Sequence, residues 1–319
     1  MSNLHIYFHK DFDGFVATAL FLRICKETQL LGADNIVLRP VNYELKKTWL
    51  KTVLERPNVV IDFLYHPKAD WWFDHHVSTF LNPAHEKSYQ NSEKQFWDIN
   101  QPSCAALIKQ NLSIASSLFF TKDEYDKIID GFREWIQWSD IIDNAKYENP
   151  AQVVELEHPC LQISETITSD IDDDYLNHLV MAAKMYSPAE VVQSQIVKTK
   201  VDNVLKMQKK YLLAFKDGYQ KIHDKVIFFD YVKHGIPFQR YMTYYFEPDA
   251  KYSVAVYNRS GAYAISVGKN PWIDFSSQNI GEICQSFGGG GRVDVGSILV
   301  TNYKKALSIT KEIFLLLNK

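Results

Sequence analysis

The chain has 319 residues, 46% of them hydrophobic and 23% charged, which is typical of a globular protein with a substantial core. This length allows one large domain or two ordinary ones. Its 35 basic and 38 acidic residues give a formal net charge of only −3. This balance argues against a protein that grips long duplex nucleic acid, because such proteins need a basic surface. A short anionic substrate, held by a few local groups and metal ions, remains compatible with it.

The four cysteines are scattered along the chain and form no Cys-x-x-Cys pair. This pattern gives no support to a zinc–thiolate site and is typical of a reducing compartment. The N-terminus lacks the basic-then-apolar pattern of a signal peptide, and no apolar run reaches transmembrane length. We therefore expect a cytoplasmic protein that does not bind membranes.

The first third of the chain alternates short apolar runs with helical stretches. Strands are expected at residues 4–9, 36–43, 58–63 and 71–73, helices at 15–22 and 45–54, and a turn at 32–35. This alternation predicts an α/β fold with a mostly parallel sheet that is covered on both faces. In such sheets, ligands bind beyond the carboxyl ends of the strands.

The middle of the chain is expected to be mainly helical. Residues 83–97 are polar and predict a loop, and helices follow at 104–108 and 122–138. The second of these helices is expected to end at an acidic cluster in residues 139–144. Residues 170–214 are again helical in pattern. Within them, residues 191–213 predict one long polar helix with an apolar stripe, suited to connect two domains.

The pattern changes near Gly218. Strands are expected at 225–229, 252–257 and 263–267, with a hairpin turn between the last two, and helices at 280–286 and 307–317. Residues 288–291 are four glycines and predict a flexible turn. The chain thus divides into a first domain at 1–190, a linker helix at 191–217 and a smaller α/β domain at 218–319.

Polar side chains gather where the predicted strands of the first domain end. They are His9, Asp11, Asp13, Asp62, Asp74, His75 and His76. Ionised carboxylates are costly to bury without partners, whereas carboxylates and imidazoles are suitable ligands for Mn²⁺ or Mg²⁺. Each motif alone is also explained as a polar turn between elements. Taken together, at successive strand ends, they predict a two-metal hydrolytic site.

These motifs resemble those of the DHH phosphoesterase superfamily, which includes RecJ exonucleases, oligoribonucleases, cyclic-dinucleotide phosphodiesterases and family II pyrophosphatases. The matching segments are His-Lys-Asp-Phe-Asp-Gly at 9–14, Val-Val-Ile-Asp at 59–62, Asp-His-His at 74–76 and Trp-Ser-Asp at 138–140. They occur in this order within the first half of the chain. Asp143 is an alternative to Asp140 for the fourth motif.

The resemblance implies two divalent cations bridged by a carboxylate, with Mn²⁺ favoured over Mg²⁺ because the ligands are mixed histidine and aspartate. The residues implied to hold them are His9 and Asp11 for one ion, Asp13, His75 and Asp140 for the other, and Asp62 as the bridge. It also implies that Asp74 orients a neighbouring imidazole, and that His76 lies near the substrate phosphate as a donor or proton shuttle.

The segment Gly-Gly-Gly-Gly-Arg-Val-Asp-Val-Gly at 288–296 resembles the glycine-rich signature of the DHHA1 substrate domain. A histidine commonly follows the glycines of that signature, and its place here is taken by Gly291 or Arg292. Arginine suits phosphate contacts, although four glycines are also explained by a tight turn. The substrate-binding residues expected here are Gly288, Gly289, Gly290, Gly291 and Arg292.

The resemblance therefore implies a DHH catalytic domain at 1–190 and a DHHA1-like substrate domain at 218–319. The implied function is Mn²⁺-dependent hydrolysis of phosphodiester bonds in short oligonucleotides or in linear or cyclic dinucleotides, and a homodimer is compatible with it. One alternative is a phosphoanhydride hydrolase acting on polyphosphate or pyrophosphate, although family II pyrophosphatases carry a different C-terminal domain. Another is a non-catalytic nucleotide-binding regulator. Such a protein is expected to have lost a metal ligand, and the motifs lack none, which argues against this alternative.

Overall fold

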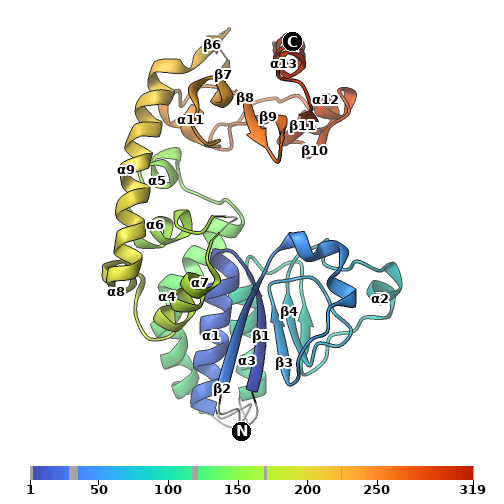
Figure 1. The fold of residues 1–319 in the computed structure, drawn as a ribbon, viewed down its shortest axis with the longest axis vertical. Coiled ribbons are helices and arrows are strands. Elements are labelled where there is room, and N and C mark those ends of the chain that lie inside the picture. Colours follow the sequence, from blue (N-terminus) through green and yellow to red (C-terminus); the bar gives the residue numbers. More distant parts are fainter. Residues whose placement is uncertain (1–2, 29–34, 117–120, 169–170, 224, 319) are drawn as a thin grey trace. The chain divides into compact units, whose positions relative to one another are not determined.

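The chain forms two compact units in the computed structural model, which describes residues 3–28, 35–116, 121–168, 171–223 and 225–318 (Figure 1). The first unit comprises Met1–Tyr147 and Glu157–Val204, and the second comprises Glu148–Leu156 and Leu205–Lys319. The helix α9 (Gln195–Gly218) contributes residues to both units. The division into domains at residues 190 and 218 stays a prediction. Among the described helices, none combines the length and the apolar character needed to cross a membrane.

The first unit is built on a parallel sheet in the order β2-β1-β3-β4-β5. Its strands are β1 (Asn3–His9), β2 (Asn35–Val41), β3 (Asn58–Ile61), β4 (Trp71–Asp74) and β5 (Gln95–Trp97). Every residue of β3 and β4 is buried, as expected for the inner strands of a sheet that is covered on both faces. The mostly parallel α/β fold expected from the sequence is confirmed.

Helix α1 (Phe12–Thr28) packs against β1 and against three further helices of the first unit (Figure 1). These are α3 (Cys104–Ser116), α4 (Lys122–Asp143) and α7 (Asp173–Ala183). The remaining helices of this unit are α2 (Pro83–Ser88), α6 (Pro159–Glu165) and α8 (Pro188–Gln193). Most of α1 is completely buried, so this apolar helix forms the centre of the helical layer.

Two expectations for the segments between strands are wrong. The helix expected at 45–54 is replaced by two short 3₁₀ helices, η1 (Tyr43–Lys47) and η2 (Trp49–Lys51). Trp49 is fully buried and donates its indole N–H to the carbonyl oxygen of Leu64, which holds the chain in these tight turns. The loop expected at 83–97 contains both α2 and the edge strand β5, since Asn82 caps the helix and Pro83 occupies its first turn.

The two long helices differ from expectation at their ends. Helix α4 starts with a capping box formed by Thr121 and Glu124, and it continues to Asp143, so the acidic cluster lies within its last turns and not beyond it. The helix expected at 191–213 is interrupted at Ser194, which has an extended backbone and separates α8 from α9. The expected turn at 32–35 and the helix start at Asp170 lie largely outside the described residues.

The strand register brings the polar strand ends into one row. Ile61 of β3 is paired with Phe8 of β1 on one side and with Phe73 of β4 on the other. The residues that follow these three in the chain are His9, Asp62 and Asp74. Because parallel strands all end at the same edge of the sheet, residues distant in the sequence meet there.

The second unit contains a six-stranded mixed sheet in the order β10-β11-β9-β8-β7-β6. Its strands are β6 (Gln220–Ile222), β7 (Val226–Asp230), β8 (Tyr252–Arg259), β9 (Ala262–Lys269), β10 (Gly290–Gly291) and β11 (Val295–Val300). Its helices, besides part of α9, are α5 (Pro150–Val154), α10 (Tyr231–His234), α11 (Met242–Phe246), α12 (Ile280–Ser286) and α13 (Tyr303–Leu317). The hairpin expected between β8 and β9 is present. Strand β11 was missed because Gly296 and Ser297 interrupt its apolar pattern.

We predict that Gly14→Ala destabilises the protein by about 1–3 kcal/mol, because a Cβ atom at this position would overlap the carbonyl oxygen of His9. Thermal unfolding would measure the change. Gly131→Ala in α4 is the matched control, since nothing lies within 4 Å of the added Cβ atom. It is expected to stabilise the helix by about 0.5–1 kcal/mol. Equal effects of the two substitutions would contradict the prediction.

Candidate metal centre

Three groups of acidic and imidazole side chains meet at the carboxyl edge of the first sheet. In each group, the candidate ligand atoms lie within 4.8 Å of one another. The groups are His9, Asp11 and Asp62; Asp62, His75 and His76; and Asp13, His75 and Asp143. Since Asp62 and His75 each occur in two groups, the three groups form one continuous cluster. Its members come from the ends of β1, β3 and β4 and from helices α1 and α4.

Asp62 occupies the centre of this cluster. Its side chain is fully buried, and neither carboxylate oxygen has a hydrogen-bond partner among the described residues. Its backbone has a φ of 56°, in the left-handed region that non-glycine residues rarely adopt. A buried carboxylate without donors and a strained backbone are both costly, and such strain occurs mainly at functional sites.

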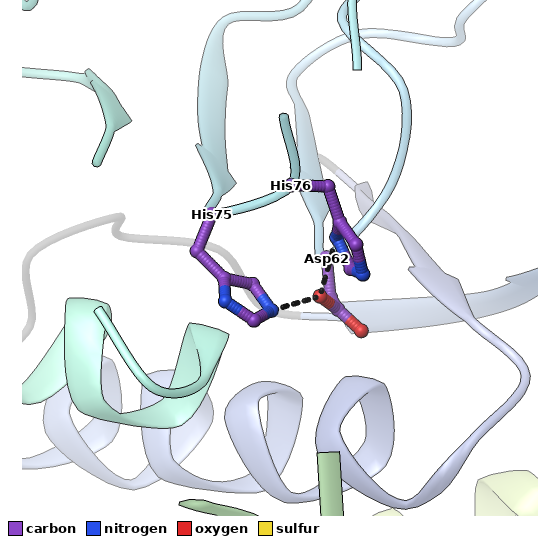
Figure 2. A group of neighbouring side chains, drawn as sticks. All are labelled: Asp62, His75 and His76. Atoms are coloured by element: carbon purple, nitrogen blue, oxygen red, sulfur yellow. Dashed lines mark ion pairs between the residues drawn. The ribbon is translucent and has the colours of Figure 1, made fainter. Parts of the chain in front are cut away.

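The two histidines of the Asp-His-His motif face the same carboxylate (Figure 2). The His75 Nε2 and His76 Nδ1 atoms each lie 3.6 Å from Asp62 Oδ1, and His9 Nδ1 lies 3.7 Å from Asp62 Oδ2. These distances exceed a hydrogen bond but are suited to ligands that share a cation between them. His75 Nε2 is buried and also lacks a hydrogen-bond partner among the described residues.

Asp74 is directed toward the protein and organises the segment that follows it. Its Oδ1 atom accepts hydrogen bonds from the backbone N–H groups of His75 at 2.8 Å and of His76 at 3.1 Å. The same oxygen lies 2.8 Å from His76 Nδ1, while Oδ2 accepts the hydroxyl proton of Thr79. Asp74 therefore holds both histidines in place, as the sequence led us to expect for one imidazole.

Asp13 links the cluster to the helical layer. One of its oxygens accepts the backbone N–H of Cys104 at 2.6 Å, and the other accepts the backbone N–H of Ala105 at 3.1 Å and the hydroxyl proton of Ser139 at 2.7 Å. The first two donors belong to the start of α3, where unpaired N–H groups favour a negative charge. His75 Nε2 lies 3.6 Å from Asp13 Oδ2. Ser139 and Thr79 are supporting residues that the sequence did not single out.

The structure places Asp143, and not Asp140, beside the histidines. Asp143 Oδ2 lies 3.6 Å from His75 Nε2. Asp140 belongs to none of the three groups among the described residues, and its Oδ1 accepts the hydroxyl proton of Ser103 at 2.5 Å. Both aspartates project from α4, and one turn of this helix separates them. Asp143, the alternative to Asp140 for the fourth motif, thus has the geometry of a metal ligand.

The side chains of the cluster have strongly perturbed pKa values. Burial lowers the pKa of each histidine, but the neighbouring carboxylates outweigh it. Asp11 and Asp62 raise the pKa of His9 to about 11, and Asp62, Asp13 and Asp143 raise that of His75 to about 10. Asp74 and Asp62 raise the pKa of His76 to about 9.

The carboxylates divide into two kinds. Burial opposes ionisation of Asp62, yet the His75 and His9 rings lower its pKa below the ordinary value. Burial and the charge of Asp62 raise the pKa of Asp13 well above its usual range, and they raise the pKa of Asp143 to about 6. Protonated histidines and protonated carboxyl groups thus keep the negative charge of the cluster low. A bound divalent cation would supply the positive charge that these protons provide.

The donor set fits a hard or borderline divalent cation. Oxygen and imidazole nitrogen are the ligands that Mn²⁺ and Mg²⁺ accept. The thiol of Cys104, next to Asp13, donates to the carbonyl oxygen of Phe73 at 3.4 Å, and burial raises its pKa well above the usual range. A protonated thiol is a poor ligand, so Cys104 does not favour a softer metal.

In the second unit, the four glycines form a defined turn and short strand, so the expected flexible turn is wrong in part. Gly288 has a φ of 81°, a conformation that glycine tolerates best. A Cβ atom at Gly289 or Gly291 would overlap a carbonyl oxygen of β11. Arg292 follows at the turn into β11; it is exposed, and its backbone N–H donates to the carbonyl oxygen of Val295 at 2.7 Å.

Comparison with known proteins gives structural similarity alone. No protein-family profile matches the sequence. No curated protein matches it either. Among solved structures, the pGpG-specific phosphodiesterase PggH from Vibrio cholerae matches with a TM-score of 0.73 and 17% identity, over 100% of this chain and 99% of that one. Forty solved chains match in all.

Two further structures are similar at lower scores. An exopolyphosphatase-related protein from Bacteroides fragilis has a TM-score of 0.52 and 11% identity, over 100% of this chain and 94% of that one. RecJ from Thermus thermophilus in complex with Mg²⁺ has a TM-score of 0.51 and 11% identity, over 99% of this chain and 49% of that one. The same RecJ in complex with Mn²⁺ has a TM-score of 0.50. These matches confirm, for the fold, the resemblance identified from the motifs.

We predict that Mn²⁺ binding to the EDTA-treated protein releases protons and becomes tighter as pH rises from 6 to 8. His9 and His75, with pKa values of about 11 and about 10, are protonated throughout this range, and they must lose their protons to bind a cation. Titration calorimetry in buffers of different ionisation enthalpy counts the released protons. Binding without proton release, or affinity independent of pH, would contradict the assignment of histidine ligands.

Proposed function

We propose that this chain, which has the fold of the DHH phosphoesterases, is a metal-dependent phosphodiesterase acting on short oligonucleotides or on linear or cyclic dinucleotides. Its proposed cofactors are two divalent cations, with Mn²⁺ favoured over Mg²⁺. PggH is described as specific for pGpG, which makes this linear dinucleotide the first substrate to test.

The observation that carries the proposal is the environment of Asp62. The Asp62 carboxylate is fully buried, accepts no hydrogen bond from the described residues and is surrounded by three imidazoles. Burying such a group costs free energy of folding, and no structural role in the fold offsets this cost. A bridging ligand between two cations needs this arrangement, with both oxygens available and with further ligands on each side.

The proposed ligands divide into two sets around Asp62. They are His9 and Asp11 on one side, and Asp13, His75 and Asp143 on the other. When bound, two such cations lower the pKa of a water molecule and neutralise charge on the phosphate under attack. Asp143 thereby takes the place that the sequence suggested for Asp140, which bonds to Ser103 instead.

The residues that act on the substrate are proposed to be His76 and its partner Asp74. The hydrogen bond between Asp74 Oδ1 and His76 Nδ1 fixes the ring orientation and leaves Nε2 for a phosphate oxygen. The His76 side chain is 29% exposed, whereas that of His75 is 7% exposed. His76 is therefore the histidine of the pair that a substrate can reach, as a hydrogen-bond or proton donor.

The glycine turn and Arg292 of the second unit are proposed to bind substrate phosphate. The exposed guanidinium of Arg292 has no ion-pair partner among the described residues, so its donors are available for a bidentate contact. The close packing of the glycines on β11 explains much of their presence structurally. The proposal for this loop thus depends mainly on Arg292.

A phosphoanhydride hydrolase is the second candidate. It is favoured by the similarity to an exopolyphosphatase-related protein, and the same metal chemistry would serve polyphosphate. A catalytically inactive nucleotide-binding protein is the remaining alternative. It differs from both enzymes in that it would bind nucleotides without hydrolysing them.

We predict that the Mn²⁺-loaded protein hydrolyses pGpG faster than cyclic di-GMP, pyrophosphate or polyphosphate. Product formation from each substrate, measured by chromatography under the same conditions, tests this order. Preferred cleavage of polyphosphate would replace the proposed function by the second candidate. Tight binding of one substrate with metal but without cleavage would indicate the inactive binding protein. Asp62→Ala is the required control and should abolish turnover, since activity in this variant would contradict the proposed bridge.

We predict that Asp143→Asn weakens Mn²⁺ binding by at least about 10-fold, in line with the loss of one metal ligand, whereas Asp140→Asn changes it far less. The two substitutions are matched, because both lie in the last turns of α4 and preserve side-chain volume. Calorimetric affinities and thermal unfolding of both variants are the measurements. A larger loss of affinity in Asp140→Asn would return the ligand role to Asp140.

A further inference from the structure

A cavity of about 470 Å³ lies in the second unit, at the end of β9 and in the loop that follows it. It is lined by Lys269, Asn270, Pro271, Trp272, Ile273, Asp274 and Asp294. None of these residues belongs to the metal centre or to the five residues expected to bind substrate phosphate. Its volume falls within the range of small-molecule sites, about 300–1,000 Å³.

The loop that forms the cavity is held rigidly. Asn270 is 1% exposed and donates both protons of its amide to backbone carbonyl oxygens of Pro248 and Ala250, at 2.9 Å each. Its Oδ1 atom accepts the backbone N–H of Trp272 at 3.0 Å. The Trp272 ring packs edge-on against Tyr241, with centroids 5.4 Å apart. The cavity therefore has a tryptophan ring in a defined position in its wall.

The polar groups of the cavity are complementary to hydrogen-bond donors more than to phosphate. Asp274 and Asp294 are both exposed, and Lys269 is the one cation among the lining residues, so the formal charge of the lining is negative. Lys269 Nζ lies 3.7 Å from Asp294 Oδ1 and 5.2 Å from the centre of the Phe275 ring. An ammonium donor and a carboxylate acceptor are thus adjacent at the cavity, whereas a phosphate would be repelled by two carboxylates.

We propose that this cavity binds a guanine base. Guanine presents two adjacent donors, N1–H and N2–H₂, to a single carboxylate, and next to them an acceptor, O6, to an ammonium. Asp294 and Lys269 have this pairing, and Trp272 offers a surface on which the base can stack. Adenine offers only one donor at the corresponding edge, and a carboxylate discriminates against bases that leave it unpaired.

This inference rests on the proposed function, since the nucleotides that it concerns belong to the proposed class of substrates. It assigns the phosphate and the base of the nucleotide to protein groups of different charge. Within the second unit, the phosphate is assigned to Arg292, and the base is assigned to a lining that carries more acidic than basic side chains. The proposal adds a preference for guanine nucleotides that the metal chemistry alone does not produce.

The test measures binding of 5′-GMP, 5′-IMP and 5′-AMP to the full-length protein in EDTA, by calorimetry. These nucleotides share their phosphate and ribose, and IMP differs from GMP only by the missing 2-amino group. GMP is expected to bind about 10- to 100-fold more tightly than AMP, with IMP in between. Asp294→Asn should abolish this preference. Its side chain is 71% exposed, so the substitution is expected to leave folding intact.

Asp217→Asn, an exposed position of α9 outside the cavity, is the matched control and should retain the preference. Trp272→Leu is a second variant and should weaken all three nucleotides. Equal affinities for GMP and AMP, or an unchanged preference in Asp294→Asn, would overturn the inference. Hydrolysis of pGpG and pApA at equal rates, unaffected by either cavity variant, would overturn it while leaving the proposed function intact. Asp294-dependent GMP binding without turnover of any dinucleotide would support the cavity and reject the proposed function.

Discussion

A buried carboxylate without hydrogen bonds from the described residues is the constraint on which the first unit depends. Asp62 follows a fully buried strand and has a left-handed backbone, and its charge is balanced by imidazoles 3.6 to 3.7 Å away. Burying such a group costs free energy of folding, because a protein core normally pairs its polar groups by hydrogen bonds. A fold tolerates the group only where other interactions offset this cost. The neighbouring strands and helices keep ligands and counter-charges around it.

The compensation comes from elements that are far apart in the sequence. The Asp74 carboxylate holds the histidine segment, and the start of α3 holds Asp13 through two backbone N–H groups. Both of these carboxylates accept hydrogen bonds, whereas Asp62 accepts none from the described residues. This contrast separates Asp74, which positions the two histidines, from Asp62, whose oxygens remain available to a cation.

Much of the fold was predictable because its signals are local. The short apolar runs of β1, β3 and β4 and the apolar helix α1 are read directly from residue type and spacing, and the alternation of such elements implies a parallel sheet. The failures lie where tertiary contacts override local preference. Residues 45–54 have a helical pattern, but the buried indole of Trp49 and its bond to Leu64 select 3₁₀ turns. Gly296 weakens the strand signal of β11, which pairing with β9 nonetheless stabilises.

The sequence by itself determined the chemistry of the candidate site, since carboxylates and imidazoles placed directly after buried strands suit few purposes other than binding cations. Only the tertiary structure decided which of them meet. Asp140 and Asp143 lie one turn apart on α4, and the choice between them depends on which one reaches His75 and which one bonds to Ser103. The cavity beside Trp272 is lined mainly by the contiguous residues 269–274, and only the pairing of β9 with β11 brings Asp294 beside them.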